Sequence, residues 1–179
     1  MEAPRIVDER DMTPQLDARI REGLCLCFPQ DREAFAHSRS WHGSNPAFCG
    51  IIEDTGKVVA HVGVVDRTVR IDDSPVRAAG IMNVFVLPSH RGLRLSDILM
   101  SAAMAEAAGR GFDIGLLFCT RPLVAIYARM GWIAGDNPVL RVEAGAESPL
   151  PEGNIPMFLP LHRQAISTSA IIHLCGNDW

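Results

Sequence analysis

The sequence IMNVFVLPSHRGLRLSDILMSAAMAEAAGR, residues 81–110, decides the fold. Its first seven residues are almost all apolar and are rich in β-branched and aromatic side chains, which predicts a buried strand. Pro88 ends that strand, because proline has no N–H to donate to a sheet ladder. Beyond a short loop, apolar residues recur at helical spacing and predict a helix with one apolar face. These residues are Leu95, Ile98, Leu99, Ala102 and Ala103.

The loop between this strand and helix is suited to bind an anion. The first N–H groups of a helix lack internal partners, and the helix dipole adds to their attraction for negative charge. Two arginines add full positive charge, so we expect a pyrophosphate site here. A surface turn with two solvated arginines is the alternative that the loop alone leaves open. The loop residues are Arg91, Gly92, Leu93, Arg94, Leu95 and Ser96.

The composition predicts a single domain over residues 1–179, long enough to bury about two-thirds of its unfolded surface. The chain has no apolar run of membrane-spanning length, and its first ten residues are too charged for a signal peptide. We therefore expect a cytoplasmic protein with no membrane partner. A net charge of −4 argues against nucleic acid and favours a cationic partner, while a homodimer is left open.

The cysteines indicate neither a disulfide framework nor a metal centre. There are five of them, an odd number, and none forms a CxxC pair. We expect reduced thiols, most of them packed in the interior, and no metal.

The rest of the chain predicts a mixed α/β fold. A strand, a loop, a helix and a second strand in succession imply a parallel central pair with a right-handed crossover. Further strands are expected at residues 5–8, 48–53, 58–71, 76–80, 112–119, 139–143, 155–161 and 165–175. Further helices are expected at residues 14–27, within 30–47 and at about 122–129, and an acidic loop at 144–153.

Two positions near the middle of the chain have more than one interpretation. His61 lies inside an apolar strand, where a hydrogen-bonded core histidine is favoured over a ligand or base. Trp41 and His42 are suited either to stack on a sugar ring or to cap a core, and both interpretations stay open.

Three segments together resemble an acyl-CoA N-acyltransferase of the GNAT superfamily. They are Val84-Phe85-Val86, the loop at residues 91–96 and the helix end AIYARMGW at residues 125–132. The chain departs from the superfamily loop at Arg94 and Ser96, where small residues are common. We expect the backbone at Arg94 to be helical and its side chain to point away from the loop.

Within the superfamily, the sequence from about Asp31 onward is most similar to the aminoglycoside 2′-N-acetyltransferases. The similarity rests on Val59-Ala60-His61, on residues 91–95, 127–132 and 158–161, and on a tail that follows Cys175 and ends in tryptophan. A second resemblance, to nodulation N-acyltransferases, rests on Arg39-Ser40-Trp41, on Ala60-His61 and on residues 86–92. Both families acylate an amino group on a sugar.

The resemblance implies a GNAT fold whose central parallel strands splay apart and admit acetyl-CoA as a co-substrate. The pantetheine arm would pair with the backbone of Val84, Phe85 and Val86, and an N–H near Val84 would stabilise the oxyanion. Tyr127, the only tyrosine, would protonate the departing thiolate.

The resemblance also implies an acceptor site with acidic groups. Glu152 matches an acidic position of the family, and Asp31 and Glu33 fall in a loop where the family has further acids. Trp179 matches a terminal tryptophan whose carboxylate would face the substrate, with Asp178 beside it, and Trp41 is a further candidate for substrate contact if it stacks on the sugar. Asp178 and Trp179 would also accept the proton of the attacking amine. Met82 stands where the family has glutamate, which suggests an acceptor with fewer amino groups.

The function implied is acetyl-CoA-dependent acetylation of an aminoglycoside amine, with the 2′-amine as the favoured position, which confers antibiotic resistance. Two alternatives remain open: a long-chain N-acyltransferase acting on an amino-oligosaccharide, and a catalytically inactive CoA-binding module.

Overall fold

The protein is described by a computed structural model that covers residues 1–162, 166–167 and 169–179. Ten strands of these residues form one mixed sheet, with the order β6-β9-β5-β4-β3-β10-β7-β8, and β2 and β1 continue from β3 as a branch. The strands are β1 (Arg5–Asp8), β2 (Phe48–Asp54), β3 (Lys57–Ile71), β4 (Ser74–Val86), β5 (Ile114–Cys119), β6 (Ile133–Ala134), β7 (Val139–Glu143), β8 (Ala146–Pro149), β9 (Ile155–Pro160) and β10 (Ile172–His173). The α-helices are α1 (Pro14–Cys27), α2 (Arg32–His37), α3 (Leu95–Gly109) and α4 (Arg121–Arg129).

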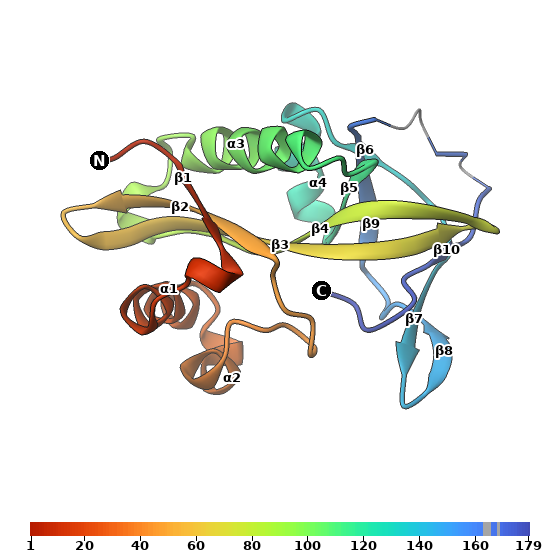
Figure 1. Cartoon of the computed structure of the whole chain (residues 1–179), viewed down its shortest axis with the longest axis horizontal. Coiled ribbons are helices and arrows are strands. Elements are labelled where there is room, and N and C mark those ends of the chain that lie inside the picture. The colour runs from red at the N-terminus through yellow and green to blue at the C-terminus, as the bar shows by residue number, and fades with distance from the viewer. Residues whose placement is uncertain (163–165, 168) are drawn as a thin grey trace.

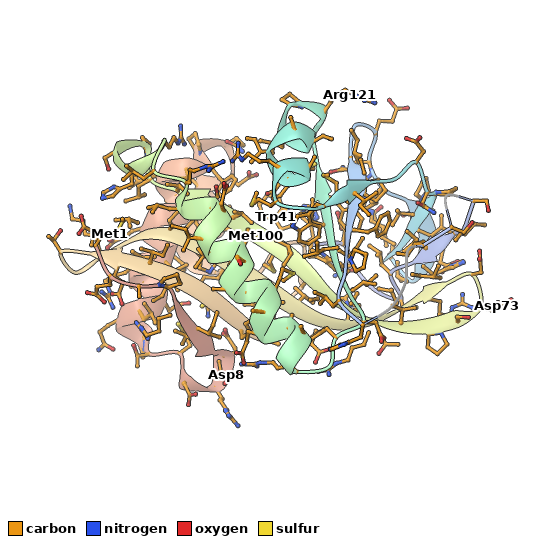
Figure 2. The ribbon with its side chains drawn as sticks, turned by 90° about the horizontal axis from the view of Figure 1, so that it is seen from above. Met1, Asp8, Trp41, Asp73, Met100 and Arg121 are labelled. Carbon is orange, nitrogen blue, oxygen red and sulfur yellow. The ribbon has the colours of Figure 1, made fainter. Side chains whose placement is uncertain are left out.

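Helices cover both faces of the sheet. Helix α3 lies on one face and helices α1 and α2 lie on the other (Figure 1). Seen from above, α3 crosses the strands with Met100 near its middle, and Arg121 marks the start of α4 at the rim (Figure 2). The α3 side of the core includes Leu95, Leu99 and Met100, each at most 2% exposed. The predicted apolar face is confirmed for Leu95, Leu99 and Ala103, which are buried, whereas Ile98 is 47% exposed and its assignment to that face is wrong.

The first helix is also confirmed with its predicted bounds. Its N-terminus is fixed by Thr13, whose side chain accepts a hydrogen bond from the N–H of Leu16, and Pro14 occupies the first helical position. Leu16, Ile20 and Leu24 are buried against the sheet. The three- and four-residue spacing of these side chains is what the sequence showed.

Two tight hairpins build the antiparallel half of the sheet. Thr55 and Gly56 join β2 to β3, with φ of 49° and 78°, which matches the primed turn that two-residue hairpins prefer. Asp72, with φ of 50°, begins the turn between β3 and β4. Strands β3 and β4 are the longest in the sheet, so β4 contributes to both ends of the molecule.

The central strands β4 and β5 pair in parallel over only part of their length. Their register runs from Ala78 opposite Ile114 to Gly80 opposite Leu116. Both strands continue beyond that point, to Val86 and Cys119, without pairing with each other. The predicted splayed parallel pair is thus confirmed, and it opens a fork in the sheet.

The C-terminal part of the chain differs from the prediction in two places. The expected loop at residues 144–153 contains β8, because Ala144 and Gly145 both have positive φ and form a two-residue hairpin turn. The expected strand at residues 165–175 is wrong over the described residues: only Ile172–His173 is a strand there, and residues 163–165 and 168 lie outside the description. The side chain of Asn137 binds the carbonyl groups of Ser167 and Ala170, so those groups do not join the sheet.

Candidate active site

A cavity of about 380 Å³ opens where β4 and β5 separate. The ends of β4 and β5 that no longer pair with each other form its inner wall, α4 covers one side, and the segment after α2 closes another. Figure 2 shows Trp41 from this segment behind the space between α3 and α4. The lining residues that enter the argument below are Asp31, Trp41, His42, Met82, Asn83, Val84, Cys119, Tyr127, Asp178 and Trp179.

The indole of Trp179 sits at the base of the fork and is 5% exposed. Its Nε1–H donates to the carbonyl oxygen of Leu116 at 3.3 Å, and Leu116 is the last residue of β5 that pairs with β4. The ring packs on Phe118, and the guanidinium of Arg67 lies 5.4 Å from the indole centroid. The C-terminal end of the chain is therefore held against the sheet, below β3 and β4 in Figure 1.

A bulge in β4 shapes the wall of the cavity at Asn83. The register between β3 and β4 shifts here, and Asn83 has φ of 54°. His61 holds the bulge: its Nδ1 lies 2.9 Å from the Asn83 carbonyl oxygen and must donate to it. The Asn83 side chain donates in turn to the carbonyl of Arg39 at 2.7 Å. Burial lowers the pKa of His61 to about 4, so the interpretation as a hydrogen-bonded core histidine is confirmed.

The bulge is followed by backbone groups that face the fork. The N–H of Leu87 donates to Val59 on β3 at 2.9 Å. Because successive residues of a strand point their N–H and C=O groups to alternate sides, the groups of Val84 and Val86 face the side that β5 has left. The Val86 carbonyl oxygen already accepts hydrogen bonds from Arg91 Nε at 3.4 Å and Cys27 Sγ at 3.7 Å, so the strand edge that a pantetheine arm would join is open at Val84.

The basic loop forms a second cavity of about 300 Å³ beside the first. Val86 and Ile126 line it, and they lie next to Val84 and Tyr127 of the fork cavity along the same strand and helix. Within the described residues, no acceptor takes the backbone N–H groups of residues 92–96. The expected anion site is therefore geometrically available, with Arg91 at its edge.

The expectation of a helical backbone at Arg94 is wrong. Arg94 lies in the left-handed region, with φ of 57° and ψ of 27°, and so does Gly92, with φ of 84°. That conformation explains why glycine is common at this loop position. The Arg94 side chain is 69% exposed, and its Nε lies 3.3 Å from Asp97, which also binds Arg129 of α4 at 2.9 Å.

Tyr127 lies in α4 and lines the fork cavity. Burial, with a smaller contribution from the neighbouring Cys119, raises the pKa of Tyr127 to about 12. The ring packs edge-on against Trp132, with centroids 6.4 Å apart. No hydrogen-bond partner for its hydroxyl is found among the described residues. A phenol in this state keeps its proton at neutral pH and is able to donate it.

The structure brings only some of the expected acidic residues to the cavity. Asp31 lines it, whereas Glu33 and Glu152 are exposed and lie outside it. Asp178 lines it too, but its carboxylate is already bound by His42 and Arg141, each at 3.0 Å. Trp41 stacks on Phe35 at a centroid distance of 5.2 Å and also lines the cavity, so it caps the core and faces the site at once.

Sequence analysis missed how several polar residues are joined around this cavity. His42 and Gly43 both have positive φ and form a turn, closed by hydrogen bonds between Trp41 and Ser44. The His-Gly dipeptide was the available signal for that turn. The pairing of the turn with Asp178 left no signal, because the two segments are more than 130 residues apart.

Two further observations concern classes of site. The described part of the chain holds no group of three or more histidine, cysteine or acidic side chains arranged for a metal ion. Within the same residues, no helix has both the length and the apolar character needed to cross a membrane.

Comparison with known proteins identifies the family. The model of the acetyltransferase (GNAT) domain family matches residues 10–134, which is more than half of the chain. This chain belongs to the GNAT acetyltransferase family. The chain is therefore an N-acetyltransferase with the GNAT fold, which uses acetyl-CoA.

Individual relatives share the fold at low sequence identity. The chain is 23% identical over 164 residues to an aminoglycoside 2′-N-acetyltransferase of Mycolicibacterium fortuitum, covering 89% of this chain and 84% of the relative. A GNAT family N-acetyltransferase of Escherichia coli, solved in complex with CoA, superposes with a TM-score of 0.64 at 15% identity over 98% of this chain and 91% of that one. A GCN5-related N-acetyltransferase of Kribbella flavida gives 0.57 at 22% identity over 74% of this chain, which spans only about a third (33%) of that longer protein.

Proposed function

We propose that this protein transfers the acetyl group of acetyl-CoA to an amine of an amino sugar, with the 2′-amine of an aminoglycoside as the first candidate. The observation that carries the proposal is the alignment of two cavities along β4 and α4. The basic loop would bind the pyrophosphate, and the thioester would reach the fork cavity, where Tyr127 and the acceptor residues meet.

The reaction we propose is direct attack of a neutral amine on the thioester carbonyl. The bond from nitrogen to carbon forms, and negative charge builds on the carbonyl oxygen, where the N–H of Val84 would stabilise it. The carbon–sulfur bond then breaks, and Tyr127 would give its proton to the sulfur. The Tyr127 hydroxyl carries its proton over the whole neutral range, as this role requires, although burial, which raises its pKa to about 12, makes it a weaker acid than a free tyrosine.

The amino-sugar acceptor is supported by the Mycolicibacterium relative and by Asp31 in the cavity wall. The cavity offers few other free carboxylates: Met82 replaces a family glutamate, and Asp178 is paired. We therefore expect an acceptor with few ammonium groups close to the amine that reacts.

The test is a panel of amines incubated with acetyl-CoA, with release of free thiol as the signal. The panel pairs aminoglycosides that carry an amine at the 2′ position with relatives that carry a hydroxyl there. We expect thiol release only with the aminoglycosides that carry an amine at the 2′ position, and NMR of the product should place the acetyl group on the 2′ nitrogen. Equal release within each pair would contradict the 2′ assignment. Release with a long-chain acyl-CoA in preference to acetyl-CoA would favour the nodulation-type alternative.

A further inference from the structure

We infer that His42 is the general base that takes the proton of the attacking amine and that Asp178 is the residue that positions it. This inference rests on the proposed function, because it assigns a role within that reaction. It also changes the expected role of Asp178, from a group that binds or deprotonates the amine directly to a group that acts through His42.

The position of His42 is fixed by its backbone. His42 has φ of 47°, which is unusual for a residue with a side chain, and such conformations persist where the surroundings hold them. The carbonyl oxygen of His42 accepts a hydrogen bond from the Asn177 side chain at 2.6 Å. Ser44, at the end of the same turn, donates from Oγ to the carbonyl oxygen of Asp178 at 2.9 Å. Arg67 binds both segments, through Ser44 Oγ at 3.0 Å and the Asn177 carbonyl at 2.6 Å.

The two oxygens of the Asp178 carboxylate have separate partners. Oδ2 lies 3.0 Å from Nδ1 of His42, and Oδ1 lies 3.0 Å from the Arg141 guanidinium. Asp178 is only 6% exposed, so this arrangement is shielded from solvent. Arg141 is itself tied to Glu143 at 2.8 Å. With both oxygens occupied, Asp178 has little capacity left to bind a substrate ammonium.

The same arrangement sets the tautomer of His42. A carboxylate facing Nδ1 is an acceptor, so Nδ1 carries the ring proton and the lone pair of the neutral ring is on Nε2. No partner for Nε2 is found among the described residues, and the His42 side chain is 46% exposed. The ring packs against Trp41 at an interplanar angle of 30°, with centroids 4.8 Å apart, which limits its rotation. A histidine that lines a cavity, is oriented by a buried carboxylate and keeps one ring nitrogen without a partner among the described residues has the arrangement of a catalytic base.

His42 and Tyr127 line the same cavity, so one reaction could use both. As the amine nitrogen bonds to the acetyl carbon, its proton passes to Nε2 of His42. As the carbon–sulfur bond breaks, the proton of Tyr127 passes to sulfur. Solvent then carries a proton from the imidazolium to the phenolate. The sum is an amide and free CoA, with no oxidant or further reactant required. The charged groups around the imidazole are Asp178, with Arg141 bound to its other oxygen, Arg67, which binds the same turn, and Asp31, which lines the same cavity.

The kinetic test compares His42→Gly and His42→Gln with the wild type, using a 2′-amino aminoglycoside and acetyl-CoA. Glycine adopts a φ of 47° without strain, so His42→Gly keeps the turn and leaves space for free imidazole. We expect kcat to fall by about two to three orders of magnitude in both variants while the Kd for CoA stays within twofold. Added imidazole should restore part of the rate in His42→Gly and none in His42→Gln. The matched control is His37→Gln, at the exposed end of α2 and outside the cavity, which should keep the wild-type rate.

Asp178→Asn should lower kcat with less effect than loss of His42, because the base remains but is poorly oriented. Turnover by His42→Gly within twofold of wild type, or a loss that imidazole cannot relieve at any concentration, would overturn the assignment.

A second measurement does not depend on the acceptor. Nitrogen-15 NMR of the labelled wild-type protein, recorded over a pH series that includes the neutral ring, should show the neutral form of His42 with its proton on Nδ1, and Asp178→Asn should change that signal. A neutral ring that carries its proton on Nε2 would overturn the inference even if an amine is acetylated. If no amine in the panel is acetylated, the proposed function fails, and the tautomer still shows whether His42 is arranged as a base.

Discussion

Gly80 gives Trp179 the space that its indole occupies: a Cβ built on Gly80 would stand 2.3 Å from Cε2 of that ring. Gly80 is also the last residue of β4 that pairs with β5. The point at which the sheet forks is therefore the point at which the chain tail inserts.

The first prediction concerns this contact. Gly80→Ala should push the indole out of the fork, lower the free energy of unfolding by about 1–3 kcal/mol and raise the acceptor KM more than the acetyl-CoA KM. Denaturant titration followed by tryptophan fluorescence, together with steady-state kinetics, measures both effects. Gly115→Ala is the matched control, because its Cβ would crowd Trp132 and Met104 instead, at 2.8 and 2.9 Å. Equal changes of acceptor KM in the two variants would show that the tail does not shape the acceptor site.

The second prediction concerns the anion loop. Gly92 has φ of 84°, and a Cβ there meets nothing within 4 Å, so Gly92→Val should strain the backbone and put a side chain where the pyrophosphate would lie. We expect the Kd for CoA, measured by calorimetry, to rise at least tenfold. Gly56→Val repeats the same backbone strain in the hairpin between β2 and β3, with φ of 78° and the same open space. It should cost similar stability and leave CoA binding unchanged. Unchanged CoA affinity in a folded Gly92→Val protein would show that the pyrophosphate does not bind at this loop.

The third prediction concerns Tyr127. Tyr127→Phe should keep CoA affinity and lower kcat by about one to three orders of magnitude, because it removes only the acid for the thiolate. Since burial raises the pKa of Tyr127 to about 12, the wild-type rate should show no loss from tyrosine ionisation at any pH below about 11. A kcat for Tyr127→Phe within twofold of the wild-type value would assign the proton to another donor.

The fourth prediction concerns stability against pH. His61 has a pKa of about 4 in the folded protein and about 6.5 when unfolded. As the pH falls below about 6.5, His61 therefore binds a proton in the unfolded chain, whereas in the folded protein it stays neutral until about pH 4. The free energy of unfolding should drop by about 2 kcal/mol between pH 7 and 5. His61→Asn, which keeps an N–H donor for the Asn83 carbonyl, should reduce that drop. An equal drop in the variant would place its origin in other groups.

Most of the strands and helices could be predicted because their signals are local. The spacing of Leu16, Ile20 and Leu24 fixes a helical face, and Thr55-Gly56 fixes a hairpin turn, each within a few residues. The left-handed backbone at Arg94 could not be predicted in the same way, because arginine takes that conformation only where the surrounding loop imposes it.

The acceptor side was less accessible to sequence reasoning. The expected roles of Glu33 and Glu152 came from matched positions in loops, and the fold leaves both outside the fork cavity. The partnership of His42 with Asp178 depends on how two distant segments meet, and no spacing within either segment encodes it. The bulge at Asn83 could not be predicted either, because a bulge is defined by its register with the partner strand.

The joining of the Trp41–Ser44 turn to the chain tail has a consequence for the order of folding. The hydrogen bond from Ser44 to Asp178 spans 134 residues, whereas the basic loop and its helix are consecutive in the chain. Contacts between distant segments cost more chain entropy to close and are slow to form. We therefore expect the basic loop and helix α3 to fold first during refolding, and the contact between the Trp41–Ser44 turn and the chain tail to form last.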